Sequence, residues 1–226
     1  APASLNSRRD LSDVRGGSII TLRGTPTPDQ LASVRALVEQ AVSMPDSVWA
    51  KGAPLFRCRQ FEADEFLLHA GEVSVYIYFL LSGVVRQFYL TPDGKQFNKS
   101  FSVEHEPCGA FHSSLTQTPS RFSIQALEAT QLLQVRFEDL TTLFEQDSHW
   151  NQLGRKSAEQ QALWNEEREA QFLLDSATDR YLRFRQQFPG LEERIAQYHV
   201  ASYLGITNVA LSRIRRKLRD EKMGAA

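Results

Sequence analysis

The chain has 226 residues, 42% of them hydrophobic, and a formal net charge of −1 at pH 7. That length suits one large domain or two smaller ones, and the near-neutral charge provides no overall attraction to nucleic acid. The two cysteines, Cys58 and Cys108, exclude a disulfide-rich scaffold and a four-cysteine zinc or iron–sulfur site within one chain. The longest apolar run, at 75–81, is far shorter than the roughly 20 residues of a membrane span. A soluble, cytoplasmic protein without membrane contact is therefore expected.

The first predicted helix begins near residue 28. Residues 1–26 are polar, with one brief strand-like stretch at 18–22, and are interpreted as a loose lead-in. Thr27 can cap the free amides, Pro28 suits the first helical position, and Gln30 completes a capping box. Apolar residues then follow at helical spacing: Leu31, Val34, Val38, Ala41 and Val42. A second short helix is predicted at 47–51.

Short segments rich in β-branched and aromatic residues follow from about residue 58 to residue 136. Turn signals separate these segments at 70–71, 82–83 and 93–94. The clearest predicted strands cover 76–81, 84–90, 96–103, 122–126 and 132–135. The pattern predicts an antiparallel β-roll or jelly roll of about eight strands, within a first domain spanning 27–147.

A long helix is predicted at 148–174, where the sequence has no Pro and a single Gly. It would be about 40 Å long at 1.5 Å per residue. Eight of its residues form a stripe in which successive members are three or four positions apart: Trp150, Leu153, Ser157, Gln160, Trp164, Glu167, Gln171 and Leu174. Half of these eight residues are polar. Two interpretations stay open, in which this stripe packs on its own β domain or forms a dimer seam. Asp175 and Ser176 interrupt the pattern, which predicts a separate helical domain at 175–226 and an α+β chain overall.

Residues 197–218 have the pattern of two helices joined by a short turn. Ala201 is small where the helices would approach, and Gly205, four residues later, suits a turn with positive φ. Thr207 can cap the second helix. Its inner stripe is aliphatic, with Leu211, Ile214 and Leu218. The alternative is a helical hairpin whose charged face is merely solvated.

The outer stripe of the second helix is polar and basic. Its residues are Asn208, Val209, Ser212, Arg213 and Arg216, and Thr207 and Lys217 complete the predicted DNA-binding set. An Arg can pair bidentately with guanine, an Asn can pair with adenine, and a Val can contact a thymine methyl group. From 208 to 226 six cations accompany two acidic residues, so the local charge can neutralise phosphates.

The order of β-roll, long helix and helix-turn-helix resembles the Crp/Fnr family of bacterial transcription regulators over roughly residues 45–218. The segments that carry the resemblance are 55–59, 66–72, 78–83, 119–128 and 211–218. The resemblance implies a homodimer whose long helices pair and which binds double-stranded DNA, with RNA polymerase as a candidate further partner. It also implies that a small effector or a redox signal in the β domain sets the DNA affinity.

Two departures concern the effector pocket. Members that bind cyclic AMP have a Glu after a Gly, whereas here Gly109 is followed by Ala110. The position of their phosphate-binding Arg falls on Ser120, with Arg121 beside it. Because the charge-assisted bonds of that recognition are lost, cyclic AMP is not the expected effector. These four residues stay candidates for a pocket that holds another small anion, and a β domain that serves as an effector-free scaffold is an equal alternative.

Two further departures concern DNA. Asn208 and Val209 stand where an Arg and a Glu are common in the family, so a different operator sequence is expected. Eight residues follow Leu218 in this sequence, so the β wing that often follows in the family is not expected.

The alternative function is that of a cyclic-nucleotide-type or haem/redox sensory protein that acts as a protein-interaction module. His105, Cys108 and His112 cluster in one region, and His69 and Cys58 lie in the same domain. Their spacing is not diagnostic of a metal site, and the sequence does not reveal the thiolate fraction of Cys108. An enzyme is disfavoured because the sequence has no phosphate-binding Gly-rich loop, nucleophile elbow or paired metal-ligand motif, so no catalytic residue and no metal ligand is assigned.

Overall fold

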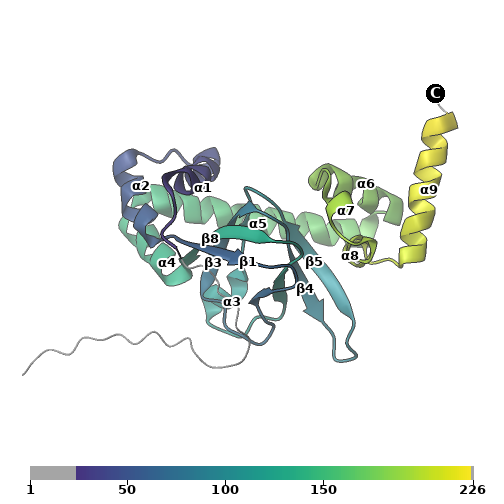
Figure 1. Cartoon of the computed structure of the whole chain (residues 1–226), viewed down its shortest axis with the longest axis horizontal. Helices are drawn as coiled ribbons and strands as arrows, with labels where there is room; N and C mark the ends of the chain where they lie inside the picture. Colours follow the sequence, from purple (N-terminus) through teal and green to yellow (C-terminus); the bar gives the residue numbers. More distant parts are fainter. Residues whose placement is uncertain (1–23, 225–226) are drawn as a thin grey trace, which may run out of the picture.

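The computed structural model describes residues 24–224, so the strand-like stretch at 18–22 and nearly all of the predicted lead-in lie outside the described residues. Two four-stranded antiparallel sheets form the β domain, in the orders β1-β8-β3-β6 and β2-β7-β4-β5 (Figure 1). Their strands are β1 (Arg57–Phe61), β2 (Phe66–Leu68), β3 (Tyr76–Ser82), β4 (Val85–Leu90), β5 (Gln96–Ser102), β6 (Pro107–Cys108), β7 (Ser123–Ala126) and β8 (Thr130–Arg136). The predicted jelly roll and its turns are confirmed.

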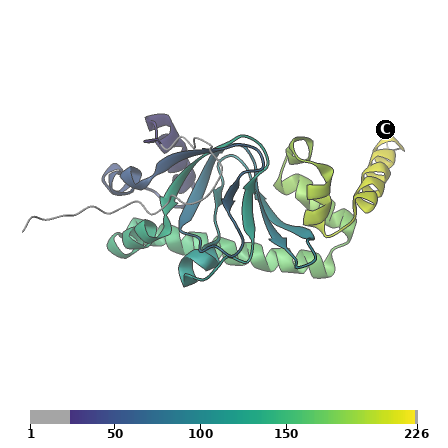
Figure 2. The ribbon, with the colours of Figure 1, turned by 60° about the horizontal axis from the view of Figure 1, so that its bottom comes forward.

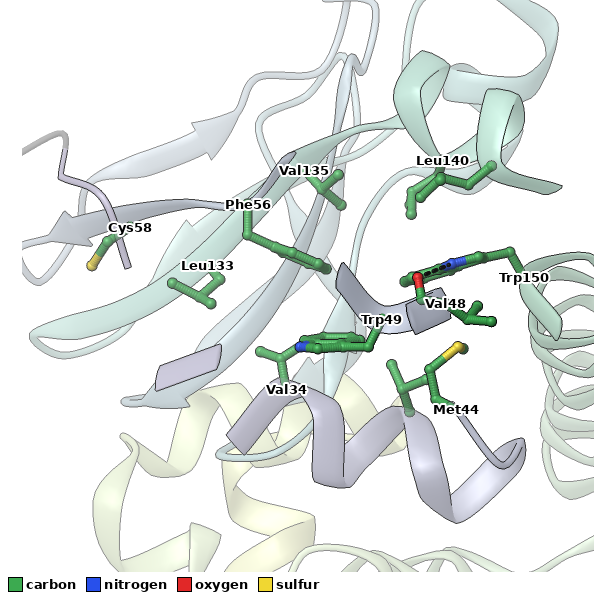
Figure 3. Packing of buried hydrophobic residues seen from close by; sticks show 12 residues of the cluster. Val34, Met44, Val48, Trp49, Phe56, Cys58, Leu133, Val135, Leu140 and Trp150 are labelled. Atoms are coloured by element: carbon green, nitrogen blue, oxygen red, sulfur yellow. Dashed lines mark hydrogen bonds between the residues drawn. The ribbon is translucent and has the colours of Figure 1, made fainter. Parts of the chain in front are cut away.

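Several short helical segments pack around the roll (Figure 1). They are α1 (Pro28–Ala41), α2 (Asp46–Gly52), the 3-10 turn η1 (Ala53–Leu55), α3 (Phe111–Thr116) and α4 (Phe137–Gln146). The predicted capping box is present, because Thr27 Oγ1 accepts from the Gln30 amide and the Gln30 side chain accepts from the Thr27 amide. Figure 3 shows the core beneath these helices, where the rings of Trp49 and Trp150 stack with centroids 6.1 Å apart. Trp150 Nε1 donates to the carbonyl of Val48 at 3.3 Å, so the buried indole N–H has a partner.

Helix α5 (Ser148–Leu174) runs along the roll and extends beyond it (Figures 1 and 2). Trp150 is buried in the core, Leu153 packs against that core, and Trp164 lies under the ammonium of Lys99, 4.8 Å from the ring centroid. The first of the two interpretations therefore holds for these three residues, which contact their own chain. Trp150 is fully buried, whereas Leu153 and Trp164 are half-buried and most of the remaining stripe is exposed. The dimer seam along the rest of α5 therefore stays a prediction.

Four helices follow α5 at its far end: α6 (Ala177–Gln187), α7 (Leu191–Arg194), α8 (Gln197–Leu204) and α9 (Asn208–Gly224) (Figures 1 and 2). Their core is not closed by these helices alone. Val84 and Phe101 of the roll belong to the same buried cluster as Phe184, Phe188 and Tyr203. The predicted division of the chain at residue 175 stays a prediction, because apolar packing continues across it.

No helix within residues 24–224 combines the length and the apolar character that a membrane crossing requires.

Candidate nucleic-acid interface

The turn between α8 and α9 has the predicted geometry. Gly205 adopts φ 69°, and the Ile206 amide donates to the carbonyl of Ala201 at 3.0 Å, which closes the end of α8. A Cβ at residue 205 would also lie 3.0 Å from the ring of Phe172, so glycine is needed for both conformation and space. Thr207 Oγ1 accepts from the Ala210 amide at 3.2 Å and caps α9.

The inner side of α9 is anchored by aliphatic side chains. Leu211 is buried, and Ile214 and Leu218 are partly buried against the same cluster that holds Val200 and Leu204 of α8. Ala201 is buried between these helices, as its small size predicted. With this stripe held in the core, the opposite side of α9 must face outwards.

The outer side of α9 is open to solvent. Thr207, Asn208, Val209, Ser212, Arg213 and Arg216 are not buried, and the last five lie on α9 itself. Four of these residues line one shallow surface depression together with neighbours from the next turns: Val209, Ser212, Arg213, Arg216, Arg219, Asp220 and Met223. The structure therefore brings most of the predicted DNA-binding residues together on one accessible helix face.

The cations of α9 divide into two groups. Within the described part of the chain, Arg213, Arg216 and Arg219 have no acidic partner, whereas Lys217 lies 3.8 Å from Glu221. Arg215 lies 3.7 Å from the carboxylate of Glu192 on α7 and is half-buried. These three guanidinium groups have no acidic partner among the described residues and are free to interact with an external anion, whereas Arg215 also has an ion pair within the chain.

The four predicted effector residues differ in burial and in hydrogen bonding. Ala110 is buried at the start of α3, and a Cβ at Gly109 would lie 2.8 Å from the side chain of Ile77. Ser120 is buried, and its hydroxyl donates to the carbonyl of Phe122 at 2.7 Å. Arg121 is exposed. No hydrogen bond among the described residues joins the first pair to the second, so a pocket made of these four residues stays a prediction.

The cysteine and histidine residues of the roll lack the features of a reactive or metal-binding site. Burial raises the pKa of the Cys108 thiol to about 11, against a weaker opposing effect of the bond from Gln87 Nε2. Burial also raises the pKa of Cys58. Both thiols are therefore protonated near neutral pH and are poor nucleophiles. Within residues 24–224, no three His, Cys, Asp or Glu side chains gather as metal ligands would.

Sequence reasoning missed the contact between α8 and the roll. Arg86, Asn98 and His199 are buried where β4 and β5 meet α8, and hydrogen bonds link them. The sequence held one signal, since Arg86 is the single charged residue within the predicted strand at 84–90.

Comparisons with known proteins agree with this architecture. Residues 58–147 match the family described as the cyclic nucleotide-binding domain. FixK2 from Bradyrhizobium japonicum is 19% identical with a TM-score of 0.63, and the match covers 73% of this chain and 85% of that protein. The c-di-GMP responsive regulator CLP from Xanthomonas campestris is 14% identical with a TM-score of 0.61, and the match covers 79% and 93%.

The chain has the Crp/Fnr fold. A putative cAMP-binding regulatory protein from Silicibacter pomeroyi shares it at 18% identity and a TM-score of 0.59, over 84% of this chain and 88% of that protein. No curated protein sequence matches the chain significantly. The predicted resemblance to Crp/Fnr regulators is thus confirmed for the fold, which is all that the structural likeness establishes at these identities.

Proposed function

We propose that the chain is a sequence-specific DNA-binding transcription regulator that acts as a homodimer. The observation that carries this proposal is the outer side of α9, where Arg213, Arg216 and Arg219 are exposed without acidic partners among the described residues. Asn208, Val209 and Ser212 lie on the same side and supply the donors, acceptors and methyl groups that distinguish base pairs in the major groove. Double-stranded DNA is therefore the partner that fits this surface.

Dimerisation would place two copies of α9 on successive half-sites. Helix-turn-helix dimers bind half-sites about one helical turn, or ~34 Å, apart, so we expect a two-fold symmetric operator. RNA polymerase is a candidate further partner, and the cytoplasm is the compartment in which both would be met.

The β domain would then transmit a signal other than cyclic AMP in its usual mode. Ala110 stands where a carboxylate would hold a ribose, and the Ser120 hydroxyl bonds within its own chain. An anion recognised by charge-assisted bonds would find fewer donors here than in a cyclic AMP site. Because CLP is a c-di-GMP responsive regulator of the same fold, this dinucleotide is a second ligand to test.

The experiment that tests the proposal is a selection of duplexes from a random-sequence pool by the purified chain, without ligand and with cyclic AMP or c-di-GMP. We expect enrichment of a palindromic sequence, and an affinity for it that falls by orders of magnitude between about 50 and 200 mM salt, as several phosphate contacts require. Enrichment that needs cyclic AMP would contradict the sensor assignment. The absence of any enriched sequence together with salt-independent binding would support an interaction module and overturn the regulator.

A further inference from the structure

Helix α8 forms hydrogen bonds with the edge strand of one sheet. Strand β5 is the last strand in the order β2-β7-β4-β5, so its outward backbone groups lack a strand partner. The hydroxyl of Ser202 on α8 accepts from the Asn98 amide at 2.9 Å and donates to the carbonyl of Gln96 at 3.0 Å. One side chain of the helix-turn-helix thus satisfies two groups of an edge that would otherwise face water.

A buried polar cluster lies beside this contact. Asn98 Nδ2 donates to the carbonyl of His199 at 2.9 Å and lies 3.2 Å from His199 Nδ1. Arg86 contacts the same ring nitrogen at 3.4 Å and donates to the side-chain oxygen of Gln125 at 2.9 and 2.6 Å. Two donors therefore point at His199 Nδ1, which fits a neutral ring with its proton on Nε2.

A β-bulge gives the sheet its matching surface. In the pairing of β4 with β5, Arg86 is opposite Phe101 and Phe88 is opposite Asn98, with a register shift between Gln87 and Phe88. Asn98 and Phe101 are three residues apart and would face opposite sides of a regular strand. The extra residue, Lys99, brings both to the face that α8 covers. Because of the bulge, the same face of β5 offers α8 a polar contact at Asn98 and an apolar contact at Phe101.

Two opposing contributions set the strength of this attachment. Phe101 packs on Tyr203 with ring centroids 5.5 Å apart and lies in the cluster of the C-terminal helices, which favours docking. Against it, docking buries the Arg86 guanidinium to 6% exposure, with neutral acceptors and the ring of Phe88 as its close partners. Burying a charge that has no carboxylate partner costs free energy, so the burial of Arg86 favours release of the C-terminal helices from the roll.

We propose that Arg86, Asn98 and His199 are positioning residues that form a latch, holding the helix-turn-helix against the roll of its own chain and thereby setting its DNA affinity. The second part of this inference rests on the proposed function. The docked arrangement leaves the outer side of α9 exposed, so docking does not mask the DNA-binding surface. It fixes the direction in which that surface points, and a released domain would have to be reoriented on binding, with an entropic cost.

The latch should be sensitive to acid. The charged and titratable groups that face His199 are Arg86 from β4, Asp64 from the turn before β2, and Tyr198 beside it on α8. Burial and then the charge of Arg86 lower the pKa of His199 to about 4. Because the released state has the ordinary pKa near 6.5, the docked state is favoured fully above pH 6.5 and loses this advantage as the pH falls through 4.

Hydrogen exchange of the full chain tests the latch directly, because the Asn98 amide is protected by Ser202 in the docked state. We expect Asn98→Ala to raise exchange at least about tenfold in peptides of β5 and α8, with β3 and β8 unchanged. Asn151→Ala is the matched control, since Asn151 also donates from its side chain to a carbonyl, that of Phe144, away from the latch. Equal exchange in Asn98→Ala and wild type would overturn the proposal.

A second variant separates the latch from general packing. His199→Gln keeps a neutral hydrogen-bonding side chain that cannot be protonated. In the wild type, exchange in β5 and α8, corrected for intrinsic rates, should rise as the pH falls from 6.5 to 4, and in His199→Gln this rise should be absent. A rise of the same size in both proteins would remove His199 from the latch.

DNA binding is measured separately, on the duplex that the wild-type chain enriches. Asn98→Ala should bind it at least about fivefold more weakly than Asn151→Ala does. If Asn98→Ala exchanges faster in β5 and α8 but binds DNA as tightly as the wild type or more tightly, the latch does not position the DNA-binding helix. The proposed function as a DNA-binding regulator would still stand. If no duplex is enriched, the proposed function fails, and the exchange experiments still decide whether the latch exists.

Discussion

At the scale of single residues, Arg213 is the side chain on which sequence selectivity should depend most. It is exposed near the middle of the outer side of α9 and has no acidic partner in the described chain. We expect Arg213→Ala to cost about 1–3 kcal/mol of discrimination at one base pair, which flattens the preference at that position of the enriched sequence. Competition between the enriched duplex and single-base variants measures the change.

Arg136→Ala is the matched control for Arg213→Ala. Arg136 is also an exposed arginine, but it lies where β8 meets α4 and approaches Glu138 at 3.8 Å. The variant Arg136→Ala should leave the selectivity for the enriched DNA sequence unchanged. Retention of full selectivity by Arg213→Ala would show that another surface reads the bases.

Gly52 is a residue at which one added carbon should disturb the core. A Cβ at this position would overlap the indole ring of Trp150, which is itself stacked on Trp49. We expect Gly52→Ala to destabilise the roll by about 1–3 kcal/mol, as overpacking does. Gly24→Ala is the control, since no atom lies within 4 Å of its added Cβ. The midpoints of urea unfolding compare the two, and equal midpoints would mean that the Trp150 ring moves aside at little cost.

At the scale of elements, the sequence predicted what depends on local pattern. The strands, the capping box at Thr27 and the turn at Gly205 each follow from residue types within a few positions of one another. The latch could not be predicted in this way, because the residues that meet there are far apart in the sequence: Asn98 and Ser202 are separated by 104 residues. The seam on α5 could not be decided from the sequence for a related reason, since a stripe with the right spacing does not say whether the roll or a second chain covers it.

The element α7 provides a second, weaker attachment of the C-terminal helices to the roll. Arg194 bonds Glu104 at 2.7 and 2.9 Å and Glu128 at 2.5 Å. The hydrogen bonds from Arg194 lower the pKa of Glu104 to about 2. This contribution is therefore present above the ordinary pKa of 4.5 and is lost as the pH falls towards 2, below the range in which His199 acts.

Because these ion pairs are partly exposed, we expect Arg194→Gln to weaken docking by about 0.2–1 kcal/mol, or at most about fivefold in hydrogen exchange of α7 at pH 7. Arg185→Gln is the control, since Arg185 pairs with Glu192 inside the C-terminal helices. A larger effect of Arg194→Gln than of Asn98→Ala would mean that α7, rather than α8, carries the main attachment.

At the scale of the whole molecule, the outward face of α5 decides the dimer. Trp150 and Trp164 are used within the chain, so a second copy must be met by the residues that stay exposed. Leu163 is 61% exposed and Leu173 is 74% exposed, and Ala170 lies between them at helical spacing. Glu159 and Glu166 lie on the same side of the helix, one turn before and one turn after Leu163. The apolar part of such a seam is short and lies in the half of α5 nearest the C-terminal helices. Dimerisation would therefore be coupled to the position of those helices.

We therefore expect the chain to sediment at micromolar concentration with twice its mass of 25.7 kDa, and Leu163→Glu to shift it to the monomer. Two added carboxylates would face each other across the seam beside Glu159 and Glu166, where like charges in contact are unfavourable. Leu115→Glu is the matched control, because Leu115 is also 61% exposed but belongs to α3 rather than to α5. Dissociation by Leu115→Glu instead would move the dimer interface to α3. A monomeric wild type would leave each α9 to bind a single half-site, and the expected two-fold operator would then be lost.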